Sequence, residues 1–161
     1  MVTGVMEVTL VKARGLKNTH FIFGGKIDPY VVIRYNNQEH RSSVAKGQGS
    51  TPVWNEKIAF RVEYPGAGPD DEHKLLLSIM DKDTVSADDF LGQSTIYLKD
   101  LFELGVEKGT AVEEPTRYSV VDSNQIYSGE IQVGITFTAK VGAEDGDDFG
   151  GWRESNPDFL T

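Results

Sequence analysis

Alternation of apolar and polar residues with a period of two limits the fold of this chain more than any other feature. The clearest case is the segment 131–137, which reads Ile-Gln-Val-Gly-Ile-Thr-Phe. Successive side chains of a β-strand point to opposite faces, so this alternation predicts a strand with one buried face. Similar patterns, or short apolar runs bounded by turn residues, occur at 6–10, 30–35, 39–44, 54–62, 75–80, 91–98 and 118–121. About eight short strands separated by turn signals predict an all-β antiparallel sandwich.

One short helix is expected at Lys99–Leu104, where two leucines share a face and Gly105 is suited to end the helix. The length of 161 residues predicts one domain. We expect that domain to span 1–140. The segment 141–161 is rich in Gly, Asp and Glu and has no hydrophobic period, which predicts a flexible tail.

The composition limits the environment and the partners of the chain. It contains no cysteine, which fits a reducing compartment, and no apolar run long enough to cross a membrane. The first seven residues lack the basic and apolar regions of a secretory signal. We therefore expect a soluble, cytoplasmic protein. With 25 acidic against 16 basic residues, the chain repels nucleic acid and anionic lipid unless a local patch or a bound cation reverses the field.

Four aspartates form the most informative local pattern. Asp28 lies just before the predicted strand at 30–35, and Asp81, Asp83 and Asp89 follow the strand at 75–80. If these strand ends are neighbours, the four carboxylates converge at one tip of the sandwich. Oxygen ligands in a flexible cluster are what Ca²⁺ prefers. The spacing is not that of an EF-hand, because the required Gly and Glu positions hold other residues.

Several motifs together resemble the C2 domain family. They are, in family order, Leu-Val-Lys-Ala-Arg-Gly-Leu at 10–16, Ile-Asp-Pro-Tyr-Val at 27–31, Thr-Pro-Val-Trp-Asn-Glu at 51–56, Met-Asp-Lys-Asp at 80–83 and Asp-Phe-Leu-Gly at 89–92. Within the family, the chain is most similar to small freestanding plant proteins described as elicitor-responsive or phloem proteins. The resemblance implies an eight-stranded Greek-key sandwich. Because a strand still follows at 129–138, it favours the permuted arrangement called type II topology.

The resemblance also implies a calcium site in the loops at one end. By position, Asp28, Asp81, Asp83 and Asp89 match the family's calcium carboxylates, and the backbone carbonyl of Lys82 matches a main-chain ligand.

A further aspartate that is usual in the family is replaced here by His20, and imidazole is a poor ligand for a hard cation. We therefore expect one good site and a second, weakened one. Asp88 is either a partial substitute or simply solvated.

Calcium would change the charge of this tip, since two Ca²⁺ ions balance four carboxylates. That change predicts calcium-dependent binding to anionic phospholipid and recruitment to the plasma membrane. Lys26 and Lys46 are candidates for headgroup contacts. Arg34 and Arg41 are weaker candidates, because they are also explained as solvated strand residues.

The segment Phe21-Ile22-Phe23 places three large apolar residues in a predicted calcium loop, before two glycines. One interpretation is that Phe21, Ile22 and Phe23 insert into lipid. The other is that one of the two phenylalanines packs onto the end of the sandwich. Val85 is a milder candidate for membrane contact. The Trp54-Asn55-Glu56 segment is interpreted as structural, with the Trp in the core.

Two other functions compete with a non-catalytic membrane-binding module. Some phloem relatives imply a carrier or adaptor for RNA or protein, although the only lateral basic patch available is made by Arg34, Arg41, Lys57 and Arg61. A metal-dependent hydrolase would need a general base or nucleophile beside the aspartates, and only His20 offers an imidazole there. We expect a monomer that binds Ca²⁺ and is not an enzyme.

Overall fold

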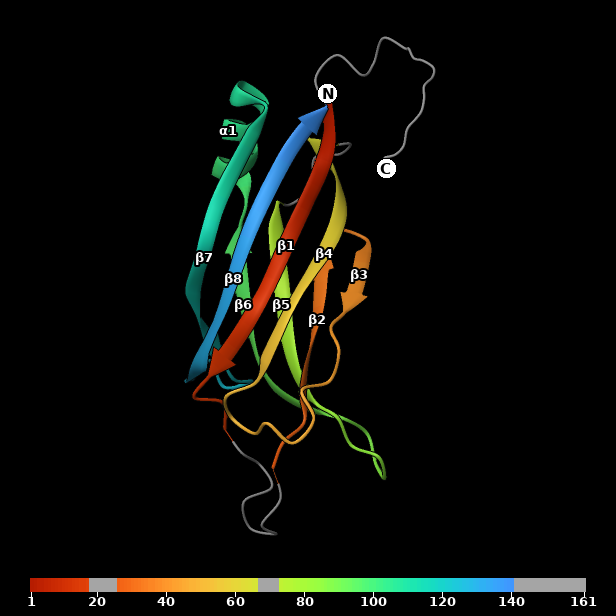
Figure 1. Cartoon of the computed structure of the whole chain (residues 1–161), viewed down its shortest axis with the longest axis vertical. Helices are drawn as coiled ribbons and strands as arrows, with labels where there is room; N and C mark the ends of the chain where they lie inside the picture. Colours follow the sequence, from red (N-terminus) through yellow and green to blue (C-terminus); the bar gives the residue numbers. More distant parts are fainter. Residues whose placement is uncertain (18–25, 67–72, 141–161) are drawn as a thin grey trace.

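The computed structural model describes residues 1–17, 26–66 and 73–140. Within these ranges it contains eight strands and one helix (Figure 1). The strands are Val2–Arg14 (β1), Pro29–Tyr35 (β2), Gln38–Arg41 (β3), Val53–Tyr64 (β4), Lys74–Asp81 (β5), Asp89–Tyr97 (β6), Thr110–Val121 (β7) and Tyr127–Lys140 (β8). The helix is Lys99–Lys108 (α1). The predicted all-β sandwich with one short helix is confirmed.

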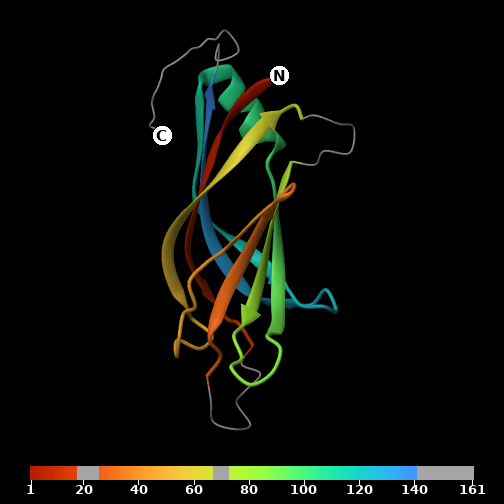
Figure 2. The ribbon, with the colours of Figure 1, turned by 90° about the vertical axis from the view of Figure 1, so that its right-hand side faces the viewer.

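The strands form two antiparallel layers, seen edge-on in Figure 2. One layer has the order β3-β2-β5-β6 and the other β7-β8-β1-β4. A single pair, Gln93 with Val121, joins β6 to β7. At the opposite edge, the side-chain amide of Gln38 donates to the carbonyl of Arg61 (2.7 Å) and accepts from its N–H (2.9 Å). Each edge between the layers is therefore closed by a small number of bonds.

The first strand lies inside its layer rather than at an edge. β1 pairs with β8 on one side and with β4 on the other, both antiparallel. Among the described residues, the first strand β1 and the last strand β8 are thus direct neighbours, with Met6 opposite Phe137. This order is the permuted, type II arrangement expected from the sequence.

The core lies between the two layers and contains the residues that the alternation selects. Along β8, Ile131, Val133, Ile135 and Phe137 are all buried. Trp54 is also buried, and its indole Nε1–H donates to the carbonyl of Pro29 (3.3 Å). This placement confirms the structural role expected for that side chain.

Helix α1 is longer than the sequence suggested, because Gly105 does not end it. A Cβ atom at Gly105 would lie 2.3 Å from Cδ2 of Phe137, so only glycine permits this approach of helix to sheet. The helix ends instead at Gly109, whose φ of 93° suits glycine and whose N–H donates to the carbonyl of Gly105 (2.7 Å).

Two strand boundaries also differ from the sequence pattern. β3 ends at Arg41 rather than near 44, and β7 begins at Thr110 rather than near 118. β7 carries irregularities in its pairing with β8 that break its alternation. The predicted tail at 141–161 lies outside the described residues. In the described part of the chain, α1 is the helix, and it is too short and too polar to cross a bilayer.

Candidate metal centre at the strand ends

The ends of three neighbouring strands bring aspartates together. Asp81, the last residue of β5, pairs with Pro29 at the start of β2 and with Asp89 at the start of β6. Asp28 immediately precedes β2, and its backbone N–H donates to Oδ1 of Asp81 (2.9 Å). The N–H of Lys82 donates to the carbonyl of Asp28 (3.0 Å). The expected convergence of strand ends is therefore present, with Asp81 only 1% exposed at its centre.

The carboxylate of Asp83 is held by its own loop. Its Oδ1 accepts from the N–H groups of Val85 (2.8 Å) and Ser86 (3.2 Å), and its Oδ2 accepts from the Ser86 hydroxyl (2.8 Å). These bonds fix the turn between β5 and β6. A cation that used both oxygens of Asp83 would therefore compete with this turn.

Asp88 links the same loop to β2. Its Oδ2 accepts from the Tyr30 hydroxyl (2.5 Å), and its Oδ1 accepts from the N–H of Asp83 (2.9 Å). Lys82 Nζ lies 3.9 Å from Oδ2. The Tyr30 hydrogen bond, followed by that from Asp83, lowers the pKa of the Asp88 carboxyl below its usual value. No sequence signal identified Tyr30 as a partner of this loop, because a buried strand Tyr is also explained as core.

A third loop, between β3 and β4, is hydrogen-bonded to Asp28, the residue just before β2. Oδ1 of Asp28 accepts from the N–H of Gly47 (2.6 Å). The carboxylate of Glu56 accepts from the N–H of Ser43 at 3.1 Å and also from its hydroxyl. The geometry of this end thus depends on side chains, those of Asp28 and Glu56, that bind loop backbone.

The donor chemistry of the strand ends fits calcium better than a soft metal, because every candidate ligand in the described ranges is an oxygen. Within those ranges, however, no three acidic side chains lie close enough together to form a ready cation site. The loop carboxylates of Asp83 and Asp88 already accept hydrogen bonds from the Ser86 hydroxyl and from the Asp83 N–H, respectively. Ligation by the four aspartates and by the Lys82 carbonyl stays a prediction, and His20 lies outside the described residues.

The candidate membrane contacts are only partly described. Val85 is 93% exposed at the tip of the β5–β6 loop, as a lipid contact would require. Phe21, Ile22 and Phe23 lie outside the described residues. Two large side chains that the sequence did not single out are also exposed where the β7–β8 turn meets β8: Ile126 at 56% and Tyr127, the first residue of β8, at 59%.

The candidate headgroup residues differ in their surroundings. Lys26 and Lys46 are exposed beside the loops. Arg34 forms an ion pair with Glu39 at 2.8 Å, which neutralises its charge locally. The guanidinium of Arg41 lies 5.7 Å from the ring centre of Tyr30, at cation–π distance. The weaker pair of candidates is therefore already engaged with partners on the protein.

Comparison with known proteins agrees with this architecture. The family model of the C2 domain matches residues 4–114. The chain is 46% identical to 16 kDa phloem protein 1 of Arabidopsis thaliana, over 98% of this chain and 100% of the relative. It is 47% identical to elicitor-responsive protein 1 of Oryza sativa subsp. japonica, over 95% and 96%.

Solved structures that resemble this chain are also C2 domains. A C2 domain-containing protein from a putative elicitor-responsive gene has a TM-score of 0.66 and 36% identity, covering 89% of this chain and 94% of the other. A calcium-bound structure of two C2 domains of extended synaptotagmin 2 has a TM-score of 0.60 and 26% identity, covering 83% and 45%. The permuted sandwich, the aspartates at its strand ends and these likenesses lead to one conclusion: the chain belongs to the C2 domain family.

Proposed function

We propose that this chain is a non-catalytic, calcium-dependent phospholipid-binding module that acts in the cytoplasm and is recruited to the plasma membrane. The observation that carries the proposal is the direct pairing of Asp81 with Asp89, together with the hydrogen bond from Asp28 to Asp81. Like charges directly opposite each other on neighbouring strands destabilise the pair, and a bound cation would relieve that repulsion. The family assignment and the calcium-bound relative support the same metal.

Asp28, Asp81, Asp83 and Asp89, with the carbonyl of Lys82, would hold the ions. Bound calcium would neutralise this tip and offer coordination positions to phosphate oxygens of a lipid. The backbone pairing of β2, β5 and β6 positions Asp28, Asp81 and Asp89 relative to one another, which would favour binding of an ion. Asp83 would have to exchange its loop amides for the ion, so binding should reorganise residues 83–86.

Membrane contact follows from the exposed residues around this tip. Val85 would place an apolar side chain in the headgroup region, and Lys26 and Lys46 would add about 1 kcal/mol each near an anionic surface. Phe21, Ile22 and Phe23 are proposed as further contacts. The names of the relatives support a role in plant defence or vascular signalling.

Sedimentation with vesicles tests the proposal. The protein should pellet with phosphatidylserine vesicles in calcium and stay in the supernatant with a chelator or with neutral vesicles. Val85→Ser should weaken vesicle binding but leave the calcium isotherm, measured by calorimetry without lipid, unchanged. Equal sedimentation with calcium and with chelator would overturn the proposal.

A further inference from the structure

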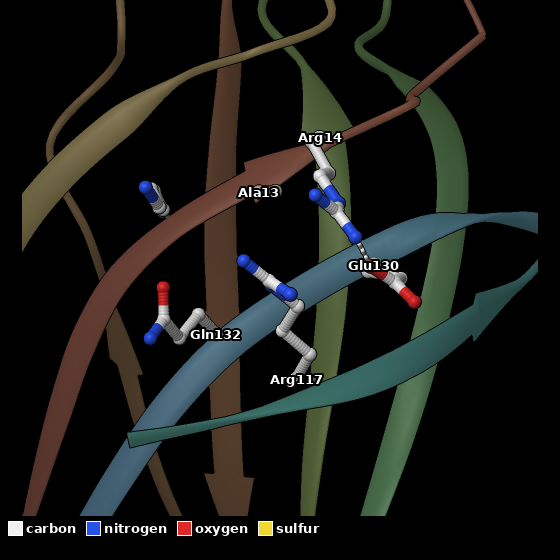
Figure 3. Close-up of a pocket in the computed structure, with 6 residues that line it drawn as sticks. Ala13, Arg14, Arg117, Glu130 and Gln132 are labelled. Carbon is white, nitrogen blue, oxygen red and sulfur yellow. Dashed lines mark hydrogen bonds and ion pairs between the residues drawn. The ribbon is translucent and has the colours of Figure 1, made fainter.

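A small hollow on the outer face of the β7-β8-β1-β4 layer lies outside the aspartate cluster (Figure 3). It has a volume of about 20 Å³ and is lined by Lys12, Ala13, Arg14, Arg117, Glu130 and Gln132. Three of these side chains are cationic and one is anionic, in a chain with a net charge of −9. This local reversal of sign marks the hollow as a candidate site for an anion.

Three polar side chains lie in one row across the strands of this hollow. Gln132 of β8 pairs with Lys12 of β1 on one side and with Arg117 of β7 on the other. Directly paired residues on one face have Cβ atoms roughly 4.5–5.5 Å apart. In Figure 3, the side chain of Arg117 reaches from β7 across β8, and that of Gln132 extends towards β1. A single small ligand can therefore touch all three.

The β1 side of this row depends on a β-bulge. Leu10 and Ala13 are both buried although they are three residues apart, because the register of β1 against β8 shifts between Leu10 and Lys12. With a strict period of two, Lys12 would share the inner face with Leu10. The irregularity therefore turns Lys12 outward.

A separate irregularity, on β7, turns Arg117 to the outer face. The register of β7 against β8 shifts between Glu113 and Thr116. Without it, Arg117 would share the inner face with the buried Ala111. Bulges commonly re-aim side chains towards a site. Two bulges on different strands that place cations on either side of one glutamine indicate a built arrangement.

The two cations of the row carry charge that is not neutralised locally. Arg14 is bound by Glu130, with its Nε and one terminal nitrogen each 2.8 Å from Oε1. Among the described residues, neither Lys12 nor Arg117 forms an ion pair. The row thus presents an ammonium, an amide and a guanidinium, all of which can donate hydrogen bonds.

We propose that Lys12, Gln132 and Arg117 bind a phosphate monoester. At neutral pH such a group carries a charge of about −1.5 to −2, which matches two cations better than a carboxylate does. A guanidinium binds two phosphate oxygens at once, and a lysine adds a point charge. The hollow has room for about one water-sized group, so one phosphoryl oxygen would enter it while the other oxygens and the esterified group stay in solvent. The site is built on the sheet, so it does not depend on calcium or on the proposed membrane function.

Nuclear magnetic resonance with phenyl phosphate tests this proposal in the presence of a chelator. We expect saturable shifts of the backbone and side-chain amides at Lys12, Arg117 and Gln132. Phenyl sulfate has the same shape but one negative charge, and it should bind more weakly. Absence of saturable shifts in this row, or equal affinity for the two esters, would overturn the proposal.

Variants on this face give effects of opposite sign. Arg117→Gln should weaken binding roughly tenfold, because it removes a charge-assisted contact. Glu130→Gln should tighten it by about threefold, since it removes a repelling carboxylate and releases Arg14. Lys57→Gln is the matched control, as Lys57 lies on the same face outside the hollow, near Glu7 (3.9 Å). An unchanged affinity in Arg117→Gln, or an equal loss in Lys57→Gln, would contradict the assignment.

The source of the phosphate is distinguished with vesicles in chelator. Vesicles containing phosphatidylinositol 4-phosphate should be compared with vesicles of phosphatidylserine at equal charge, using wild type and Arg117→Gln. If the protein is retained only on vesicles with phosphatidylinositol 4-phosphate, and Arg117→Gln abolishes this retention, the phosphate belongs to a lipid headgroup. Inositol 1-phosphate that binds in an Arg117-dependent manner while neither vesicle retains the protein identifies a soluble ester. Failure of both ligands to bind would refute the site.

Discussion

Replacing Asp81 by Asn separates metal binding from fold stability. Asp81 is buried between two strand neighbours and accepts a hydrogen bond from the N–H of Asp28 through Oδ1. Asparagine keeps the shape and this acceptor. It removes a negative charge that lies directly across from Asp89. Without calcium, we expect the free energy of unfolding of the variant to stay within about 1 kcal/mol of wild type.

Calcium should then stabilise only the wild type. A ligand at about 100 times its Kd adds about 2.7 kcal/mol to the free energy of unfolding. In a domain of this size, each kcal/mol raises Tm by roughly 2–4 °C. Thermal unfolding with saturating calcium should therefore raise Tm by about 5–11 °C relative to chelator. In Asp81→Asn that rise should disappear.

Asp122 provides a matched control at the β7–β8 turn. Its Oδ1 accepts from the N–H groups of Asn124 (2.9 Å) and Ile126 (3.0 Å), and Lys17 Nζ lies 3.2 Å from Oδ2. These bonds, first that from Ile126, lower the pKa of the Asp122 carboxyl. Asp122→Asn should lower Tm equally with calcium and with chelator. A full calcium shift in Asp81→Asn, or its loss in Asp122→Asn, would refute the ligand assignment.

Two other outcomes test the packing and the loop electrostatics. Gly105→Ala should destabilise the fold by about 2 kcal/mol in chemical denaturation, because overpacking against Phe137 outweighs a gain of about 1 kcal/mol in helix propensity; a stabilised variant would contradict the close approach. Tyr30→Phe should raise the pKa of Asp88, as followed by carboxyl-carbon resonances. A carboxyl whose pKa is lowered in the folded state stabilises the fold above its ordinary pKa, and this stabilisation is lost as the pH falls. The Tyr30→Phe variant should therefore lose the stabilisation at a higher pH than wild type. An unchanged pKa of Asp88 in the variant would argue against the hydrogen bond.

The sequence predicted the strands because buried residues alternate with exposed ones along a pleated strand. Along β8, the alternation from Ile131 to Phe137 identified the buried positions of that segment. The same rule failed on β7, where a register shift between Glu113 and Thr116 breaks the period and hid the first half of the strand. Gly105 misled for another reason: glycine permits close packing as well as helix termination, and only the position of Phe137 distinguishes the two.

The candidate site was predictable in its chain positions but not in its bonding. Aspartates at the ends of neighbouring strands could be expected to lie near one another, and Asp81 does pair with Asp89 and accept a hydrogen bond from the backbone N–H of Asp28. The sequence did not reveal that Asp83 holds its own turn or that Tyr30 binds Asp88. Such bonds depend on side-chain direction and loop path, which leave no period in the sequence. Calcium ligation itself stays a prediction.

The central place of β1 has a consequence for synthesis on the ribosome. Its neighbour β8 begins only at Tyr127, so an emerging chain displays an unpaired row of N–H and C=O groups along one side of β1 until the residues from Tyr127 onward have been made. Such a row is a template for pairing with other chains. A nascent chain stalled before Tyr127 should therefore be prone to aggregate or to need chaperones, whereas emergence of β8 allows the layer to be completed.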